Sequence, residues 1–188
     1  VFTLYHIGFQ LYDPRSALAA AGLFSSGFLV LGEAHLAKTD TVLMALALVQ
    51  QWALMKLYLA WQHGQPPPRH DWLWFWLAMA AGILVKGPVL PVLALLSVAA
   101  LCLWHQQFRW LAIIRFWRGF AIVLILCLPW ALLVSAATDG AFLSTAISGD
   151  LLAKVKSGQE SHGAAPGSYA LVLALLIWPA TPLLIWAA

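Results

Sequence analysis

Ionisable side chains gather in the short stretch EAHLAKTD, residues 33–40, between two long apolar runs. The stretch holds four of them within eight positions: Glu33, His35, Lys38 and Asp40. The plainest interpretation is that Thr39 or Asp40 caps the next helix, where a carboxylate also suits the positive end of the helix dipole. Four ionisable groups exceed what a cap requires, and such groups at a membrane boundary are candidates for function. Both interpretations stay open.

A single lysine interrupts the apolar run GILVKGPVLPVL, residues 82–93. In one interpretation Lys86 ends a helix, where the dipole favours a cation, and extends towards lipid headgroups. In the other it offers a point charge to a phosphate that remains attached to a lipid. The segment is not a phosphate-binding P-loop, because it lacks the glycine spacing and the following Ser or Thr.

A third group of polar residues lies in the long connection 138–168. Apolar and charged residues between Phe142 and Lys156 are spaced as in a helix lying on the membrane surface. The loop SGQESHGAAPG then carries Glu160 and His162, and a loop of this length is either a binding segment or an inert connection. We find no catalytic triad, HExxH or paired zinc-ligand motif, so the sequence assigns no metal ligands.

The composition shows which solvent surrounds these groups. The chain has 188 residues, of which 63% are hydrophobic and 9% are charged, whereas soluble domains carry about 25% charged residues. Most of the chain is therefore expected to lie in lipid. The net charge of +3 is small and forms no basic stripe, so nucleic acid is not an expected partner. Without an initiator Met, the chain is interpreted as one transmembrane domain, 1–188, from inside a larger polytopic protein.

Hydropathy and length predict an all-α membrane protein with about six spans and a partial helix over 1–12. The expected spans are 16–33, 41–61, 72–85, 87–104, 119–137 and 169–188. The run from Trp72 to Trp104 would be about 50 Å long as one helix, against a hydrocarbon core of about 30 Å. Because proline fits the start of a helix better than its interior, a tight hairpin is predicted at Lys86-Gly87-Pro88.

This hairpin fixes the predicted sidedness. The connections near 13–15, 62–71 and 105–118 then share one side and carry all five arginines. Lys56 is expected to extend towards the same side, and the charged aromatic stretch 105–118 is expected to lie in the membrane interface. The basic excess places this side in the cytoplasm, so Asp40, Lys86 and the 138–168 connection face outward.

The order and spacing of several short segments resemble a known family. The segments are PRSALAAAGLF, EAHLAKTDTVLMALAL, GILVKGPVLPVL, LPWALLVSA, GDLLAKV and ESHGAAPGSYALVLALLIWP. Together they look like the polyprenyl-phosphate-sugar-dependent glycosyltransferases of the C-type membrane fold. That family includes the lipid A aminoarabinose transferase and bacterial relatives of the dolichyl-phosphate-mannose–protein mannosyltransferases.

The resemblance implies transfer of a sugar from a polyprenyl-phosphate donor to a lipid, glycan or protein acceptor at the outer membrane face, in bacteria the periplasmic face of the inner membrane. It implies that Lys86 lies near the donor phosphate and that Asp40 supports the active site. His162 and Tyr169 match a His–Pro–Tyr-like segment of the family with looser spacing. The main catalytic carboxylate is expected upstream of residue 1.

The chemistry of sugar transfer is compatible with these residues. A departing phosphate needs cations, an acceptor hydroxyl needs a carboxylate base, and sugar hydroxyls need polar contacts. The candidate substrate-binding residues are Lys86, Asp40, Glu33, His35, His162, Glu160 and Tyr169. No cofactor is assigned, and a role for a divalent cation stays open. Two alternatives also stay open: a transporter or flippase segment, in which Lys86 lies deep at a broken helix, and a noncatalytic membrane scaffold.

Overall fold

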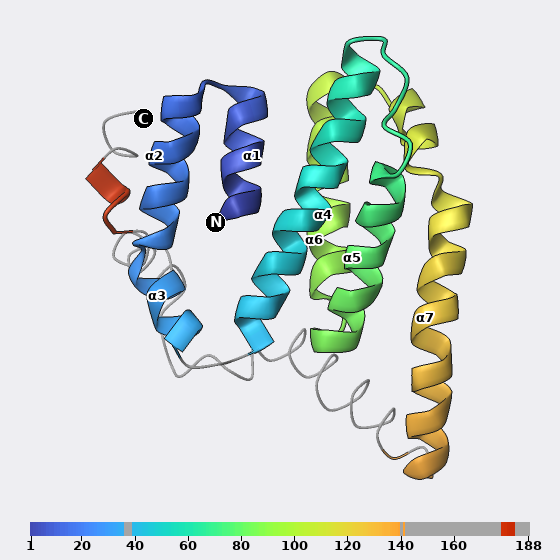
Figure 1. Cartoon of the computed structure of the whole chain (residues 1–188). Coiled ribbons are helices and arrows are strands. Elements are labelled where there is room, and N and C mark those ends of the chain that lie inside the picture. The colour runs from blue at the N-terminus through green and yellow to red at the C-terminus, as the bar shows by residue number, and fades with distance from the viewer. Residues whose placement is uncertain (36–38, 140, 142–177, 183–188) are drawn as a thin grey trace.

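The computed structural model describes residues 1–35, 39–139, 141 and 178–182, and every element assigned in these ranges is helical (Figure 1). In chain order the elements are α1 (Phe2–Leu11), α2 (Pro14–Ser25), α3 (Phe28–His35), α4 (Thr39–Gln62), α5 (Asp71–Lys86), α6 (Val89–His105), the 3-10 helix η1 (Arg109–Ile114) and α7 (Phe116–Ala137). The all-α class is thus confirmed for the described part of the chain. The predicted surface helix within 138–168 and most of the predicted span 169–188 lie outside it.

Two of the described helices, α4 and α7, are long and apolar enough to cross a membrane. Helix α6 is apolar but has 17 residues, and α5 has 16. The total of six spans stays a prediction. The predicted segments 41–61, 72–85, 87–104 and 119–137 each match one helix to within three residues at either end.

The segment predicted as a span over 16–33 is not one helix, because the structure divides it into α2 and α3. Two serine hydroxyls turn back onto the backbone at the division. The Ser25 hydroxyl donates to the carbonyl oxygen of Gly22 at 2.9 Å, and the Ser26 hydroxyl donates to that of Leu23 at 3.1 Å. Hydroxyls that bond to nearby carbonyls compete with the helical pattern, and Gly27 follows directly.

The predicted hairpin at Lys86-Gly87-Pro88 is confirmed. Helix α5 ends at Lys86, Gly87 has a φ of 70°, and its N–H donates to the carbonyl oxygen of Ile83 at 2.9 Å. A positive φ suits glycine, which has no Cβ to clash with the backbone. Pro88 then precedes the first turn of α6, where its missing N–H leaves no helical hydrogen bond unmade.

The two arms of the hairpin approach closely at Gly82 of α5 and Leu90 of α6. A Cβ added at Gly82 would lie 2.5 Å from Leu90 Cδ2 and 3.0 Å from its Cβ. Leu90 is fully buried, so it has little room to move away. The absence of a side chain at position 82 therefore lets α5 and α6 pack against each other directly after the turn.

We expect Gly82→Ala to lower the free energy of unfolding by about 1 kcal/mol. Crowding in a packed core lowers the free energy of unfolding by about 1–3 kcal/mol. The better helix propensity of alanine offsets about 1 kcal/mol of this loss. Thermal unfolding in detergent, followed by circular dichroism, measures the change. Gly22→Ala is the matched control, because a Cβ there meets no atom within 4 Å, and it should leave the protein as stable as before or more so. Equal effects of the two variants would contradict the close approach.

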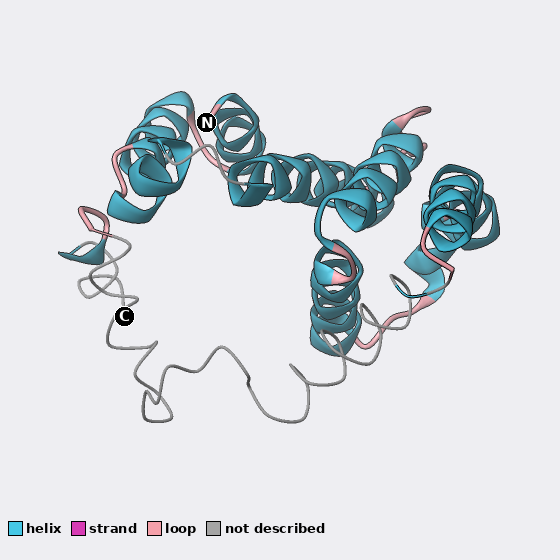
Figure 2. Cartoon of the chain, turned by 90° about the horizontal axis from the view of Figure 1, so that it is seen from below, coloured by secondary structure: helices cyan, strands magenta, loops and turns pink. Residues whose placement is uncertain are grey.

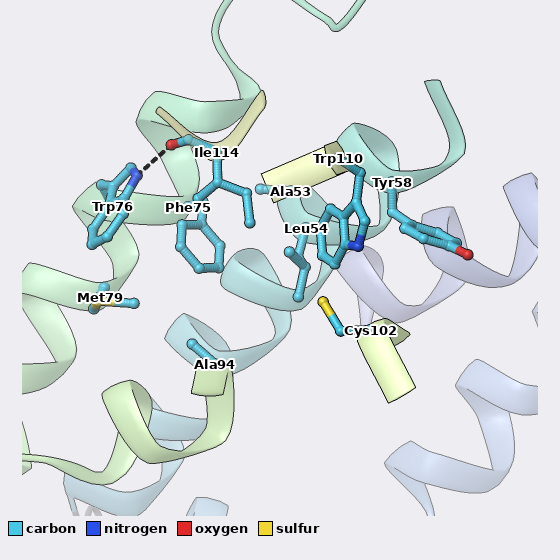
Figure 3. Packing of buried hydrophobic residues seen from close by; sticks show 10 residues of the cluster. All are labelled: Ala53, Leu54, Tyr58, Phe75, Trp76, Met79, Ala94, Cys102, Trp110 and Ile114. Atoms are coloured by element: carbon cyan, nitrogen blue, oxygen red, sulfur yellow. Dashed lines mark hydrogen bonds between the residues drawn. The ribbon is translucent and has the colours of Figure 1, made fainter. Parts of the chain in front are cut away.

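The buried core joins α4, α5 and α6 to η1 (Figure 3). Trp110 of η1 is fully buried and lies edge-on to Tyr58 of α4, with ring centroids 5.2 Å apart. Within the stretch 105–118, for which an interfacial position stays a prediction, Trp110 thus packs into the protein. The aromatic side chains of Phe108 and Trp117 in the same stretch are exposed.

Helix α7 is attached to α5 near its first turn. Gly119 is its one buried residue, and it faces the ring of Trp76. The Trp76 indole N–H donates to the carbonyl oxygen of Ile114 at 2.8 Å (Figure 3). Trp76 thus holds η1 and the start of α7 together. Much of the rest of α7 presents exposed apolar side chains such as Ile125 and Leu133.

The helices place the polar groups at two opposite ends. The connections that carry the arginines, those after α1, α4 and α6, lie at one end in Figure 1, as predicted. The hairpin after α5 and the start of α4 lie at the other end. Figure 2 shows α1 and α2 on one side of α4. Helices α5 and α7 lie on its other side. Of these neighbours, α5 makes the most extensive contact with α4.

Candidate functional site

An ion pair joins the two residues for which the sequence predicts a common side. Asp40 lies in the first turn of α4, and Lys86 is the last residue of α5. Because these helices run antiparallel, the two ends meet, and the Lys86 ammonium donates a hydrogen bond to Asp40 Oδ1. Each charge also suits its helix terminus, since a carboxylate is favoured at the N-terminal end and a cation at the C-terminal end.

This pair is accessible. The side chain of Lys86 is 48% exposed and that of Asp40 is 40% exposed. Exposed ion pairs contribute at most about 1 kcal/mol. A doubly charged anion that reaches this end of the helices could therefore displace the Asp40 carboxylate from Lys86 at little energetic cost. The arrangement can hold an anion while a carboxylate stays beside it.

The other predicted site residues are placed less fully. Glu33 and His35 both lie on α3. The exposed His35 ring uses Nδ1 to donate to the carbonyl oxygen of Leu31 at 2.7 Å, a bond within its own helix. Glu160, His162 and Tyr169 lie outside the described residues. The structure thus brings together Asp40 and Lys86 from the predicted set.

A second ion pair, which sequence reasoning missed, lies at the opposite end of the same two helices. Lys56 of α4 donates to Asp71 Oδ1 at 2.6 Å, and its ammonium lies 4.1 Å from the centroid of the Trp52 ring. Lys56 thus extends towards the end of the helices that carries the arginines, as predicted, and its ammonium contacts a carboxylate and an aromatic ring of the protein there. The sequence signal was Asp71 itself, an acid in the first turn of α5.

A cavity of about 300 Å³ adjoins this second pair. Apart from the pair, its walls are apolar and come from α4 and α5: Val49, Trp52, Ala53 and Trp74. Asp71 Oδ2 is buried and has no hydrogen-bond partner. Within the part of the chain that the structure describes, no three His, Cys, Asp or Glu side chains gather closely enough to hold a metal ion.

Comparison with known proteins finds one matching family and several related transferases. Residues 1–132 match the model of the dolichyl-phosphate-mannose-protein mannosyltransferase family. The undecaprenyl phosphate-alpha-4-amino-4-deoxy-L-arabinose arabinosyl transferase of Pseudomonas paraeruginosa (strain PA7) is 33% identical over 129 residues. The transferases of the same name from Pseudomonas aeruginosa strains UCBPP-PA14 and LESB58 are 33% and 31% identical over 130 residues.

These alignments cover 66% of this chain and 22% of each relative, so the chain spans about a fifth of the length of the curated relatives it matches. No solved structure matches. The family match includes both residues of the exposed ion pair, Asp40 and Lys86, and extends over more than half of the chain. This chain therefore belongs to the dolichyl-phosphate-mannose-protein mannosyltransferase family.

Proposed function

We propose that the chain is part of an integral-membrane glycosyltransferase. The enzyme takes a sugar from a polyprenyl-phosphate-linked donor and transfers it to a lipid, glycan or protein acceptor. The reaction takes place at the outer face of the membrane, in bacteria the periplasmic face of the inner membrane. The names of the related transferases and the family match support the class of reaction.

The accessible Asp40–Lys86 pair is the observation that carries this proposal. When the bond between the sugar and the phosphate breaks, the bonding electrons go to the phosphate, whose negative charge increases. A cation already fixed in place stabilises that charge without rearrangement. Lys86 stands at the end of an apolar helix, where a phosphate on a lipid tail would arrive. As the donor binds, Lys86 releases the Asp40 carboxylate and pairs with the phosphate.

Asp40 has a supporting role in this proposal, because it holds Lys86 in position when no donor is bound. Glu33, His35, Glu160, His162 and Tyr169 are proposed to contact the sugar or the acceptor. The acceptor hydroxyl must lose a proton to a carboxylate, and we assign that base to a part of the protein upstream of residue 1. The activity is therefore proposed for the whole protein and not for this chain alone.

The position of Lys86 favours this function over transport. Transporters place ionisable groups near the middle of the bilayer, at broken helices. Lys86 instead ends α5, and nearly half of its side chain is exposed. Such a residue suits a phosphate held at the membrane boundary better than an occluded site along a transport path.

The proposal is tested by comparing two lipids that differ only in the phosphate. The full-length protein in detergent is titrated with undecaprenyl phosphate or with undecaprenol, and its thermal unfolding is recorded. A bound ligand stabilises the folded state by about 2.7 kcal/mol when its concentration is a hundred times its Kd. We expect undecaprenyl phosphate to raise the midpoint and undecaprenol to have much less effect. Equal shifts, or none with either lipid, would contradict recognition of a lipid phosphate.

A further inference from the structure

Helices α4 and α5 carry the same pair of charges in the same order. Each has an aspartate in its first turn and a lysine towards its end: Asp40 and Lys56 on α4, and Asp71 and Lys86 on α5. The two charges are 16 positions apart on α4 and 15 apart on α5, or about 24 Å and about 22 Å along the helix axes. Because the spacings nearly agree, the antiparallel helices form both ion pairs at once.

The two pairs differ in how far water reaches them. At the hairpin end, the side chains of Lys86 and Asp40 are about half exposed. At the other end, the side chain of Lys56 is 23% exposed and that of Asp71 only 8%. Charge attraction is screened less when water is excluded, and an unpaired buried charge is strongly unfavourable. The less exposed pair, Lys56–Asp71 (the inner pair), is therefore fixed, whereas the Asp40–Lys86 pair can exchange partners.

The surroundings of Lys56 restrain it further. Its ammonium faces the Trp52 ring one turn earlier on α4, which adds a cation–π contact to the ion pair. The Trp52 indole N–H donates to Gln10 Oε1 of α1 at 3.4 Å. The lysine is thus held by α4 and α5, and through Trp52 it is connected to α1.

We propose that Lys56 and Asp71 are positioning residues for the site at the other end of the helices. Their ion pair fixes how far α4 and α5 are shifted along each other, and this shift decides whether Lys86 and Asp40 meet. A slip of one turn would move Lys86 about 5.4 Å along α4, beyond reach of its present partner. This inference rests on the proposed function, in which Lys86 holds the donor phosphate, and adds that a pair about 22 Å away sets its place.

The test uses the full-length protein and two readouts. In a background without Cys102 and Cys127, cysteines at positions 40 and 86 are joined by a short thiol-specific cross-linker, which reports the shift between the helices without any ligand. Separately, in the protein with its native Asp40 and Lys86, the affinity of the folded fraction for undecaprenyl phosphate reports the position of Lys86. Both are measured for Lys56→Met, for Asp71→Asn and for the exchanged pair Lys56→Asp with Asp71→Lys.

We expect Lys56→Met to reduce the cross-linking yield several-fold and to weaken undecaprenyl phosphate binding about tenfold. Asp71→Asn should have a smaller effect, because Lys56 retains the Trp52 ring and some contact with water, whereas Lys56→Met leaves the buried Asp71 unpaired. The exchanged pair should restore both readouts, but only in part, because its lysine at position 71 lies in the first turn of α5, where the helix dipole disfavours a cation. Arg69→Met removes an exposed cation at the same end and should change neither readout.

Two results would overturn the inference. One is unchanged cross-linking and unchanged affinity in Lys56→Met and Asp71→Asn, even if the variants unfold more easily, since a purely structural pair would alter stability alone. The other is an exchanged pair that behaves no better than Lys56→Met. If the wild-type protein fails to bind undecaprenyl phosphate, the proposed function is wrong, and the cross-linking yield alone decides whether the inner pair aligns the helices.

Discussion

Gly119→Ala is expected to destabilise the protein by at least about 3 kcal/mol, at the upper end of the range for crowding in a core. A Cβ at position 119 would lie 1.9 Å from Cε2 and Nε1 of Trp76, far inside van der Waals contact. The rigid indole cannot rotate away, because Phe75 and Phe116 pack edge-on against it, with ring centroids 5.3 Å and 5.8 Å away. Any movement also breaks its hydrogen bond to Ile114. Unfolding of the detergent-solubilised protein measures the loss.

Two comparisons separate crowding from other effects of the substitution. Trp76→Leu combined with Gly119→Ala should lose less stability than the sum of the two single variants, because leucine lacks the indole ring that clashes with a Cβ at position 119. Contacting residues give such non-additive effects in double-mutant cycles. Gly22→Ala, where a Cβ meets open space, controls for the change in helix propensity. If Gly119→Ala is as harmless as Gly22→Ala, α7 does not contact α5 as described.

The hairpin was predictable because its causes are local. A helix through Trp72–Trp104 would exceed the thickness of the membrane core, and Gly87-Pro88 offers the backbone freedom and the helix start that a turn needs. The positive φ of Gly87 and the end of α5 at Lys86 follow from those properties. Once the turn is placed, the common end for Lys86 and Asp40 follows from counting helices. The family was likewise recognisable from short segments around these residues.

Other features depend on contacts between side chains that a hydropathy profile does not predict. The division between α2 and α3 comes from where the Ser25 and Ser26 hydroxyls point, and serine is tolerated within many helices. The Lys56–Asp71 pair depends on the alignment of α4 with α5. The burial of Trp110 depends on how η1 packs against Tyr58 of α4, which residue type alone does not predict. In each case a polar or aromatic side chain met a protein partner instead of solvent or lipid.

Lys86→Ala is expected to lower the rate of sugar transfer by the full-length enzyme about 100- to 1000-fold. This is the usual effect of removing one preorganised group that stabilises charge in a transition state. Folding should change little, because the pair with Asp40 is exposed and contributes at most about 1 kcal/mol. The rate is measured as release of polyprenyl phosphate from a sugar-bearing donor in proteoliposomes, with the amount of folded protein determined in parallel.

Three further variants show whether the loss belongs to the phosphate site. Lys86→Arg should recover most of the rate, since a guanidinium also binds phosphate. Arg118→Ala removes an exposed cation from the first turn of α7, a helix that begins at the end opposite to the hairpin (Figure 1), and should leave the rate unchanged. Asp40→Asn should tighten undecaprenyl phosphate binding by up to about fivefold, because it removes a competitor worth at most about 1 kcal/mol. Weaker binding in Asp40→Asn would instead mean that Asp40 holds Lys86 in place even when the phosphate is bound.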